Sequence, residues 1–325
     1  MYDRDPNVVV IGGGTGLSTL LTGLKRFPVN LTAIVTVADD GGSSGRIRKN
    51  LNTIPPGDIR KVLISLSETD DLLGKLFDYR FNKDSYLSND SLGNLLLYAM
   101  TDITGDSIKA IEYLSQVLNV KGTVLPVSTK PIELCADMED GTTVYGESNI
   151  TSAGKKIDQI YFKNQDVKAT PHVIKAIENA DMIVLGPGSL YTSIIPNILI
   201  PEVKEALIKS EAIKIYISNV MTELGETDDF DVSDHLTVLE SYLGKNQVET
   251  VLANEDYEVD GDILIRYLKS GCRFVTVDYK TLSLMGIEVY TAKLLSVNDE
   301  EYIRHDSRRL ATHVFALLLD KMKND

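Results

Sequence analysis

The chain has 325 residues, with 47 acidic and 33 basic side chains and a formal charge of −14, which argues against nucleic acid or an anionic membrane as its main partner. No apolar run approaches the roughly twenty residues of a membrane span, and the first residues lack the apolar core of a signal peptide. Two distant cysteines and four histidines without ligand spacing argue against disulfides and a zinc site, so we expect a reduced, cytoplasmic protein.

Residues 7–24 predict a strand, a glycine turn and a helix. The β-branched run at 8–11 suits a strand buried on both faces, and leucines recur at helical spacing from Leu17 to Leu24. A helix N-terminus offers free N–H groups and a favourable dipole to an anion. We therefore expect phosphate binding by the turn between them, which consists of Gly12, Gly13, Gly14, Thr15 and Gly16.

This turn is not a complete dinucleotide fingerprint, because Leu17 stands where the third glycine would be. The Lys-Ser or Lys-Thr pair of a P-loop is also absent, which argues against a triphosphatase. A tight turn without a ligand remains the alternative.

A second glycine turn follows the apolar strand predicted at 31–37. Carboxylates at the end of such a strand meet a ribose hydroxyl or a metal in an open α/β sheet, although a solvated acidic turn is the alternative. The candidate ligand-binding residues here are Asp39, Asp40, Gly41, Gly42, Ser43, Gly45 and Arg46.

The next segments predict helices and then a group of short β-strands. Helices are expected after Asp58, over 72–81, after Asn94 and over 108–118, and Asn94 is either a helix cap or a ligand contact. Four short alternating runs within 122–166 then predict a small antiparallel β insertion. We expect a structural or lid role for this insertion and place no site residue on it.

A third glycine turn follows the strand predicted at 182–185. Its candidate residues are Gly186, Pro187, Gly188, Ser189, Leu190 and Tyr191, and a later strand at 213–217 runs into Asn219 and Thr222. Ligands of open α/β sheets bind outside the carboxyl ends of the strands, so these turns are expected to converge on one crevice. The alternative for any one of these turns is that it only connects two elements and binds no ligand.

The last third predicts helices at 234–243, 262–269 and 310–321 and strands at 250–253 and 273–277. Arg304, Arg308 and Arg309 lie close together in an acidic chain, where they either bind phosphate or pair with local acids. Ser307 lies among them, and its modification would add negative charge beside the arginines.

Several blocks resemble the bacterial gluconeogenesis factor (YvcK-like) family of the CofD-like, or 2-phospho-L-lactate transferase, superfamily. They run in family order over nearly the whole chain: IGGGTGLSTLLTGLK, ADDGGSSGRIR, PPGDIRK, SLGNLLL, GESNI, VLGPGSLYTSIIPN, SNVMTELGETDDFDVSDHL and RHD. One departure is Asn89-Asp90, where the family pattern has Gly-His.

The resemblance implies one CofD-like α/β domain over residues 1–325, a Rossmann-like three-layer sandwich with a mostly parallel sheet. It implies a regulator that binds a UDP-N-acetylglucosamine-like ligand and affects central carbon metabolism, cell-wall precursor supply and cell shape. The three glycine turns, Asn94, Asn219, Thr222 and Arg304 carry over as its pocket.

The transferase relatives imply an alternative, a Mg²⁺-dependent phospholactate-type transfer from a nucleotide diphosphate, with Asp39 and Asp40 holding the metal. The regulator requires no cofactor, and nicotinamide dinucleotide is disfavoured by the missing third glycine. A homodimer and the identity of a protein partner are left open.

Overall fold

The computed structural model describes residues 4–51, 53–69, 71–82, 87, 88, 90–164 and 166–324. Its centre is a seven-stranded sheet in the order β10-β9-β8-β7-β1-β2-β3, and each pair of neighbours is parallel. The strands are β1 (Asn7–Gly12), β2 (Asn30–Val35), β3 (Thr123–Pro126), β7 (Met182–Leu185), β8 (Ile213–Ile217), β9 (Thr250–Asn254) and β10 (Glu288–Ala292).

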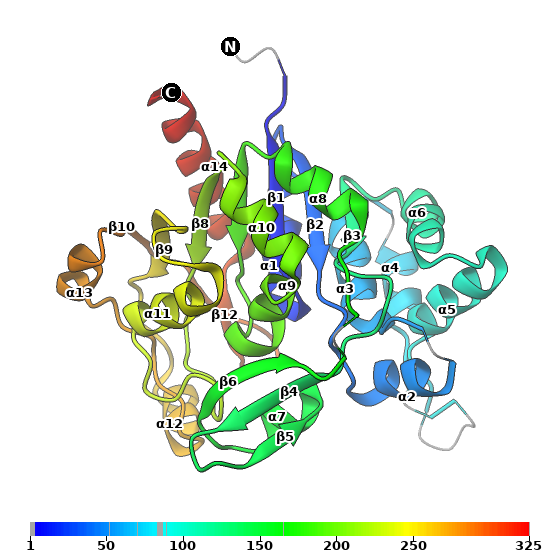
Figure 1. The fold of residues 1–325 in the computed structure, drawn as a ribbon, viewed down its shortest axis with the longest axis horizontal. Helices are drawn as coiled ribbons and strands as arrows, with labels where there is room; N and C mark the ends of the chain where they lie inside the picture. Colours follow the sequence, from blue (N-terminus) through cyan, green and yellow to red (C-terminus); the bar gives the residue numbers. More distant parts are fainter. Residues whose placement is uncertain are drawn as a thin grey trace.

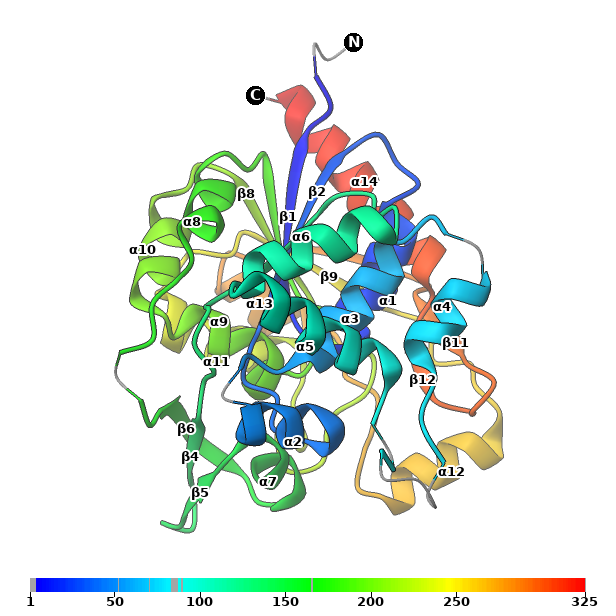
Figure 2. The ribbon, with the colours of Figure 1, turned by 90° about the vertical axis from the view of Figure 1, so that its right-hand side faces the viewer.

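Helices cover both faces of this sheet, as Figures 1 and 2 show. One face carries α1 (Gly14–Leu24), α3 (Pro56–Leu66) and α14 (Ser307–Asn324); the other carries α8 (Pro171–Glu178), α9 (Ile195–Ile198), α10 (Pro201–Lys209) and α11 (Val232–Leu243). The middle strands are therefore buried on both sides: every residue of β7 is buried. The predicted α/β three-layer sandwich is confirmed.

The strand order reverses between β1 and β7. From β1 the chain builds outward through β2 to β3, whereas β7 to β10 build outward in the other direction. The loops that leave two such strands separate to opposite faces, which opens a crevice at the carboxyl edge of the sheet. The first and third glycine turns leave β1 and β7 at this point.

Smaller elements gather at the carboxyl edge of the sheet, and most of them lie in the lower part of Figure 1. They are an antiparallel sheet of β4 (Leu134–Met138), β5 (Thr143–Tyr145) and β6 (Ile157–Phe162), the helices α7 (Glu147–Ser152), α2 (Gly42–Leu51) and α12 (Gly261–Lys269), and the hairpin of β11 (Leu295–Val297) and β12 (Ile303–His305).

A short π-helix, η1 (Leu190–Ile194), leads directly into α9, and the other remaining helices lie toward the edges of the main sheet. They are α4 (Asp71–Asp78), α5 (Leu92–Thr104) and α6 (Ser107–Val117) on the β3 side and α13 (Tyr279–Leu284) beside β10. Of the helices in the described ranges, none is both long enough and apolar enough to cross a membrane.

Two of the predicted strands are placed differently in the structure. The first run of the β insertion is β3, which pairs in parallel with β2, so the antiparallel sheet begins at Leu134. The run at 273–277 forms only an isolated bridge, Phe274 to Met221. Both runs are apolar enough for a strand, and pairing partners distant in sequence decided their roles.

Candidate functional site

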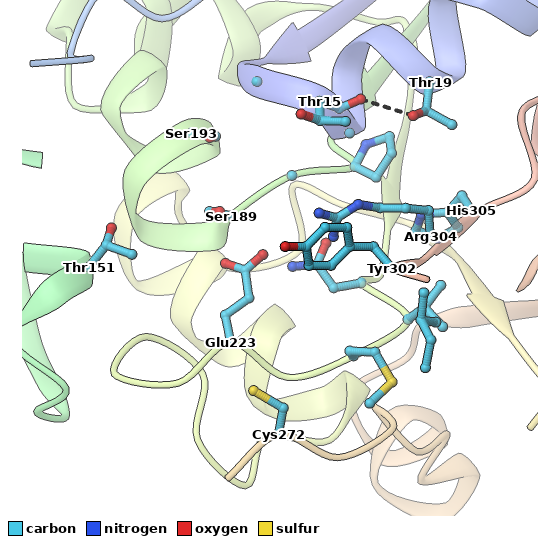
Figure 3. A pocket seen from close by; sticks show the side chains of 18 of the residues that line it. Thr15, Thr19, Thr151, Ser189, Ser193, Glu223, Cys272, Tyr302, Arg304 and His305 are labelled. Atoms are coloured by element: carbon cyan, nitrogen blue, oxygen red, sulfur yellow. Dashed lines mark hydrogen bonds between the residues drawn. The ribbon is translucent and has the colours of Figure 1, made fainter. Parts of the chain in front are cut away.

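A cavity of about 780 Å³ opens at the switch point. Its walls come from five parts of the chain: the start of α1, the loop after β7, the segment after β8, the α3 and α7 side, and the α12 and β12 side. Figure 3 shows side chains from these walls facing one another across the space. The volume suits a ligand of cofactor size.

The glycine loop after β1 presents main chain to the cavity. Gly13 is the N-cap of α1 and no side chain of the described residues caps that end, so the first N–H groups of the helix are available to a ligand. Gly14 has φ +64, a left-handed conformation that favours glycine. A Cβ on Gly16 would lie 2.5 Å from the carbonyl oxygen of Pro187, so glycine lets the two loops touch. Together they form an anion cradle made of backbone.

Acidic side chains line the rim beside this cradle. Asp39 follows β2 and faces Asp58 in the first turn of α3, and burial followed by the charge of Asp58 raises the pKa of Asp39. Lys61 pairs with Asp58 at 3.1 Å. Glu147 completes this side, and burial together with the nearby aspartates raises its pKa to about 7. Carboxylates that raise one another's pKa favour a bound cation or a shared proton.

Asp40 has a different role from Asp39. Its carboxylate accepts the N–H of Ser148 at 2.9 Å, at the start of α7. This bond ties the second glycine turn to the β insertion and brings Glu147 and Thr151 into the cavity wall. The insertion therefore contributes site residues, contrary to our expectation.

The opposite wall is formed by β12. Arg304 lies over the ring of Tyr302 at 5.3 Å, a cation–π contact that orients its guanidinium (Figure 3). His305 is buried, which lowers its pKa to about 4 and keeps the ring neutral. The backbone N–H of Ile303 donates to the hydroxyl of Tyr267 on α12 at 2.9 Å, so α12 and β12 form one wall.

The segment after β8 supplies a carboxylate and an amide. Glu223 reaches toward Ser189 in Figure 3, and burial raises its pKa although Ser189 and Arg304 oppose the shift. The amide nitrogen of Asn219 is buried and has no hydrogen-bond partner in the described part of the chain. A polar group of a ligand would satisfy it.

The structure brings half of the predicted residues to this cavity. Those that line it are Gly13, Gly14, Thr15, Gly16, Asp39, Pro187, Gly188, Ser189, Asn219, Thr222 and Arg304. Those outside its lining are Gly12, Asp40, Gly41, Gly42, Ser43, Gly45, Arg46, Asn94, Gly186, Leu190 and Tyr191.

The residues outside the lining have other contacts. Asn94 accepts from Arg60 at 3.1 Å and donates to Ser43 at 3.1 Å, in a buried network behind the second turn. Its helix is capped by Ser91 instead. Arg46 pairs with Asp90 at 2.6 Å. Asp90 and Asn89 are the two positions that depart from the family pattern, and Asn89 lies outside the described residues.

Further lining residues were missed from the sequence. They include Asp58, Lys61, Glu147, Thr151, Ser193, Glu223, Arg266, Tyr267, Cys272, Tyr302 and His305. Asp58 follows Pro55-Pro56-Gly57, a pattern that marks a loop before a helix. We interpreted Asp58 as the cap of that helix and not as a site residue. The others lie in segments whose position depends on the fold of the whole chain.

Comparison with known proteins agrees with this architecture. A Bacillus subtilis protein named gluconeogenesis factor is 46% identical over 320 residues, 98% of this chain and 99% of that protein. A Halalkalibacterium halodurans protein of the same name is 48% identical over 308 residues, 95% of each chain.

A crystal structure of a Bacillus halodurans protein superposes with a TM-score of 0.92 at 47% identity, covering 96% of this chain and all of that one. A second one, described as a member of the UPF0052 family, gives the same TM-score. Residues 8–295 match the family described as 2-phospho-L-lactate transferase CofD. The chain belongs to the 2-phospho-L-lactate transferase CofD family, and it is similar over nearly its whole length to proteins named gluconeogenesis factor.

Proposed function

We propose that this protein is a cytoplasmic regulator that binds a nucleotide diphosphate sugar of the UDP-N-acetylglucosamine type and acts as a gluconeogenesis factor. In this role it would adjust central carbon metabolism, cell-wall precursor supply and cell shape to the level of that ligand. The name of the Bacillus subtilis relative supports the metabolic part of the proposal.

One observation carries the ligand class. Two glycine segments touch at Gly16 and Pro187, and the uncapped N–H groups at the start of α1 lie at a cavity whose opposite wall holds Arg304. Backbone N–H groups and a guanidinium recognise a diphosphate without needing a positively charged protein. The cavity also has room for a nucleoside and a sugar.

Isothermal titration with UDP-N-acetylglucosamine tests the proposal. We expect saturable binding, and Arg304→Ala should weaken it by about tenfold or more, since a charged hydrogen bond is lost. Arg308→Ala is the matched control, because Arg308 is exposed and is not among the cavity residues. Absence of binding heat at millimolar ligand would contradict the proposal.

A transferase is the second candidate, favoured by the family match and by the facing carboxylates of Asp39 and Asp58. Mg²⁺ commonly takes one or two carboxylates together with water and substrate phosphates, so this pair suits it. Asp58, although it pairs with Lys61, is a better second ligand than Asp40, because Asp58 lines the cavity and Asp40 does not. In the described ranges, no group of three or more His, Cys, Asp or Glu side chains is arranged so that it could hold a metal ion.

The two candidates differ in their response to Mg²⁺. In the transferase, Mg²⁺ bound with the nucleotide would neutralise diphosphate charge, and Asp39→Asn should abolish the tightening of UDP binding by Mg²⁺. Titrations of wild type and variant with and without the metal measure this. Equal UDP affinities for wild type and Asp39→Asn, each with and without Mg²⁺, would favour the regulator.

A further inference from the structure

The cavity is chemically divided. Its α1 end offers backbone N–H groups, whereas the carboxylate of Glu223 enters from the segment after β8, on the other side of Ser189 (Figure 3). Phosphate is attracted to the first end and repelled from the second. A ligand that fills both therefore has an anionic part and an uncharged part.

Glu223 is held in place by its own turn. Its N–H donates to the hydroxyl of Thr227 at 2.9 Å, and the N–H of Thr227 donates back to the carbonyl of Glu223 at 2.9 Å. Gly225, within this turn, packs closely on Gly154: a Cβ there would lie 3.0 Å from the Gly154 Cα. The backbone that carries this carboxylate is thus fixed before a ligand arrives.

A second carboxyl lies close to the first. Glu226 is 3% exposed, and one of its oxygens accepts from Thr192 at 3.0 Å and from Thr151 at 3.3 Å. Its other oxygen is buried and has no partner among the described residues. Phosphate near Glu223 would meet its carboxylate, whereas a hydroxyl or amide N–H would donate to Glu223.

A second, independent observation points to a polar ligand group here. Asn219 lines the same wall, is 8% exposed, and its buried amide nitrogen is unpaired in the described ranges. A donor left unpaired in the protein suits a carbonyl or hydroxyl oxygen of a ligand. Acceptor and donor together suit a sugar, which offers both kinds of group.

We propose that Glu223 is the specificity residue for the uncharged, hydroxyl-bearing part of the ligand, and that it selects against a further phosphate at this place. The proposal rests on the nucleotide-diphosphate function above and adds to it the reason why a sugar is preferred. Ser189 lies beside the Glu223 carboxylate in Figure 3, and the charge of Arg304, which we assign to the diphosphate, also acts on that carboxylate.

The test compares UDP-N-acetylglucosamine, UDP and UTP by titration calorimetry on the full chain. In wild type we expect the sugar nucleotide to bind at least about tenfold more tightly than UDP, and UTP more weakly than UDP. In Glu223→Ala the sugar advantage should fall to about one, with UDP affinity kept and UTP affinity raised. Glu223→Gln, which keeps the volume, should lose the discrimination against UTP.

Glu258→Gln is the control, since Glu258 is exposed and lies outside the cavity. An unchanged ratio of UDP to UDP-sugar affinity in both Glu223 variants would overturn the proposal, as would an equal loss of all three ligands. If Glu223→Ala does not fold, as judged by circular dichroism, the ratios in Glu223→Gln decide. If wild type binds none of the ligands, the nucleotide function itself fails.

Discussion

Glu226 is a buried carboxyl whose proton depends on the fold. Burial, followed by the charge of Glu223, raises its pKa to about 8, and the hydroxyls of Thr192 and Thr151 only partly oppose this. In the folded protein Glu226 is therefore protonated at neutral pH, while in the unfolded chain it is ionised. A neutral side chain avoids placing an unpaired charge in the core.

The sign of the pH dependence follows from that difference. Between about pH 5 and 8 the unfolded state binds fewer protons at this residue, so the free energy of unfolding falls as pH rises. Glu226→Gln has no such proton, so we expect its free energy of unfolding to fall less between pH 5 and pH 8. The fall should be smaller than that of wild type by at least about 1 kcal/mol. Urea unfolding at both pH values measures it. Parallel pH profiles of wild type and variant would contradict the assignment.

The cavity depends on a contact between two loops, one before α1 and one after β7. Gly16 touches Pro187, and the N–H of Gly186 donates to the carbonyl of Ile11 at 2.9 Å, which holds the loops side by side. Because the start of α1 supplies N–H groups to the cavity and packs on the loop after β7, a change in their spacing alters the anion cradle as well as stability.

Gly16→Ala should separate these loops. Its Cβ would clash with the Pro187 carbonyl at 2.5 Å, so we expect a loss of about 1–3 kcal/mol in unfolding free energy and at least about tenfold weaker nucleotide binding. Gly74→Ala in α4 is the control, since its nearest neighbour would lie 4.0 Å away, and it should stay within about 1 kcal/mol of wild type. Wild-type nucleotide affinity in Gly16→Ala would exclude the cradle.

At the scale of the whole molecule, the C-terminal helix closes the site from behind. Helix α14 packs on α1, and β12, with Arg304 and His305, directly precedes it. A Cβ on Gly23 of α1 would lie 2.2 Å from the carbonyl oxygen of Ser307. The position of the β12 wall thus depends on how closely two helices from opposite ends of the chain approach each other.

Gly23→Ala should therefore affect both stability and binding. We expect an unfolding free energy lower by about 1–3 kcal/mol, since the helices must move apart, and weaker nucleotide binding as Arg304 shifts. Thermal melts with and without ligand measure the two effects. Gly261→Ala, where a Cβ would meet open space, is the matched control. If Gly23→Ala is as stable as wild type and ligand raises its melting temperature by the same amount, the position of β12 does not depend on this contact.

Particular residues show how far sequence reasoning reached. Gly13 to Gly16 and Ser189 were correctly expected to meet, because both turns end neighbouring strands. Asp40 and Asn94 were expected at the ligand, but one caps α7 and the other joins Arg60 and Ser43. Adjacent residues in a turn point in different directions, and spacing alone does not tell which one faces the cavity.

The sequence by itself determined strands β1, β2, β7, β8 and β9 and the turns at their ends, since apolar periodicity, glycine and proline act over a few residues. Tertiary structure decided which side chains meet across the cavity. Asp39 faces Asp58, and Glu223 faces Ser189, because parallel pairing of β2, β1, β7 and β8 aligns their carboxyl ends. Glu147 joins them only because Asp40 binds the start of α7. Such contacts depend on the register between distant segments, which no local pattern encodes.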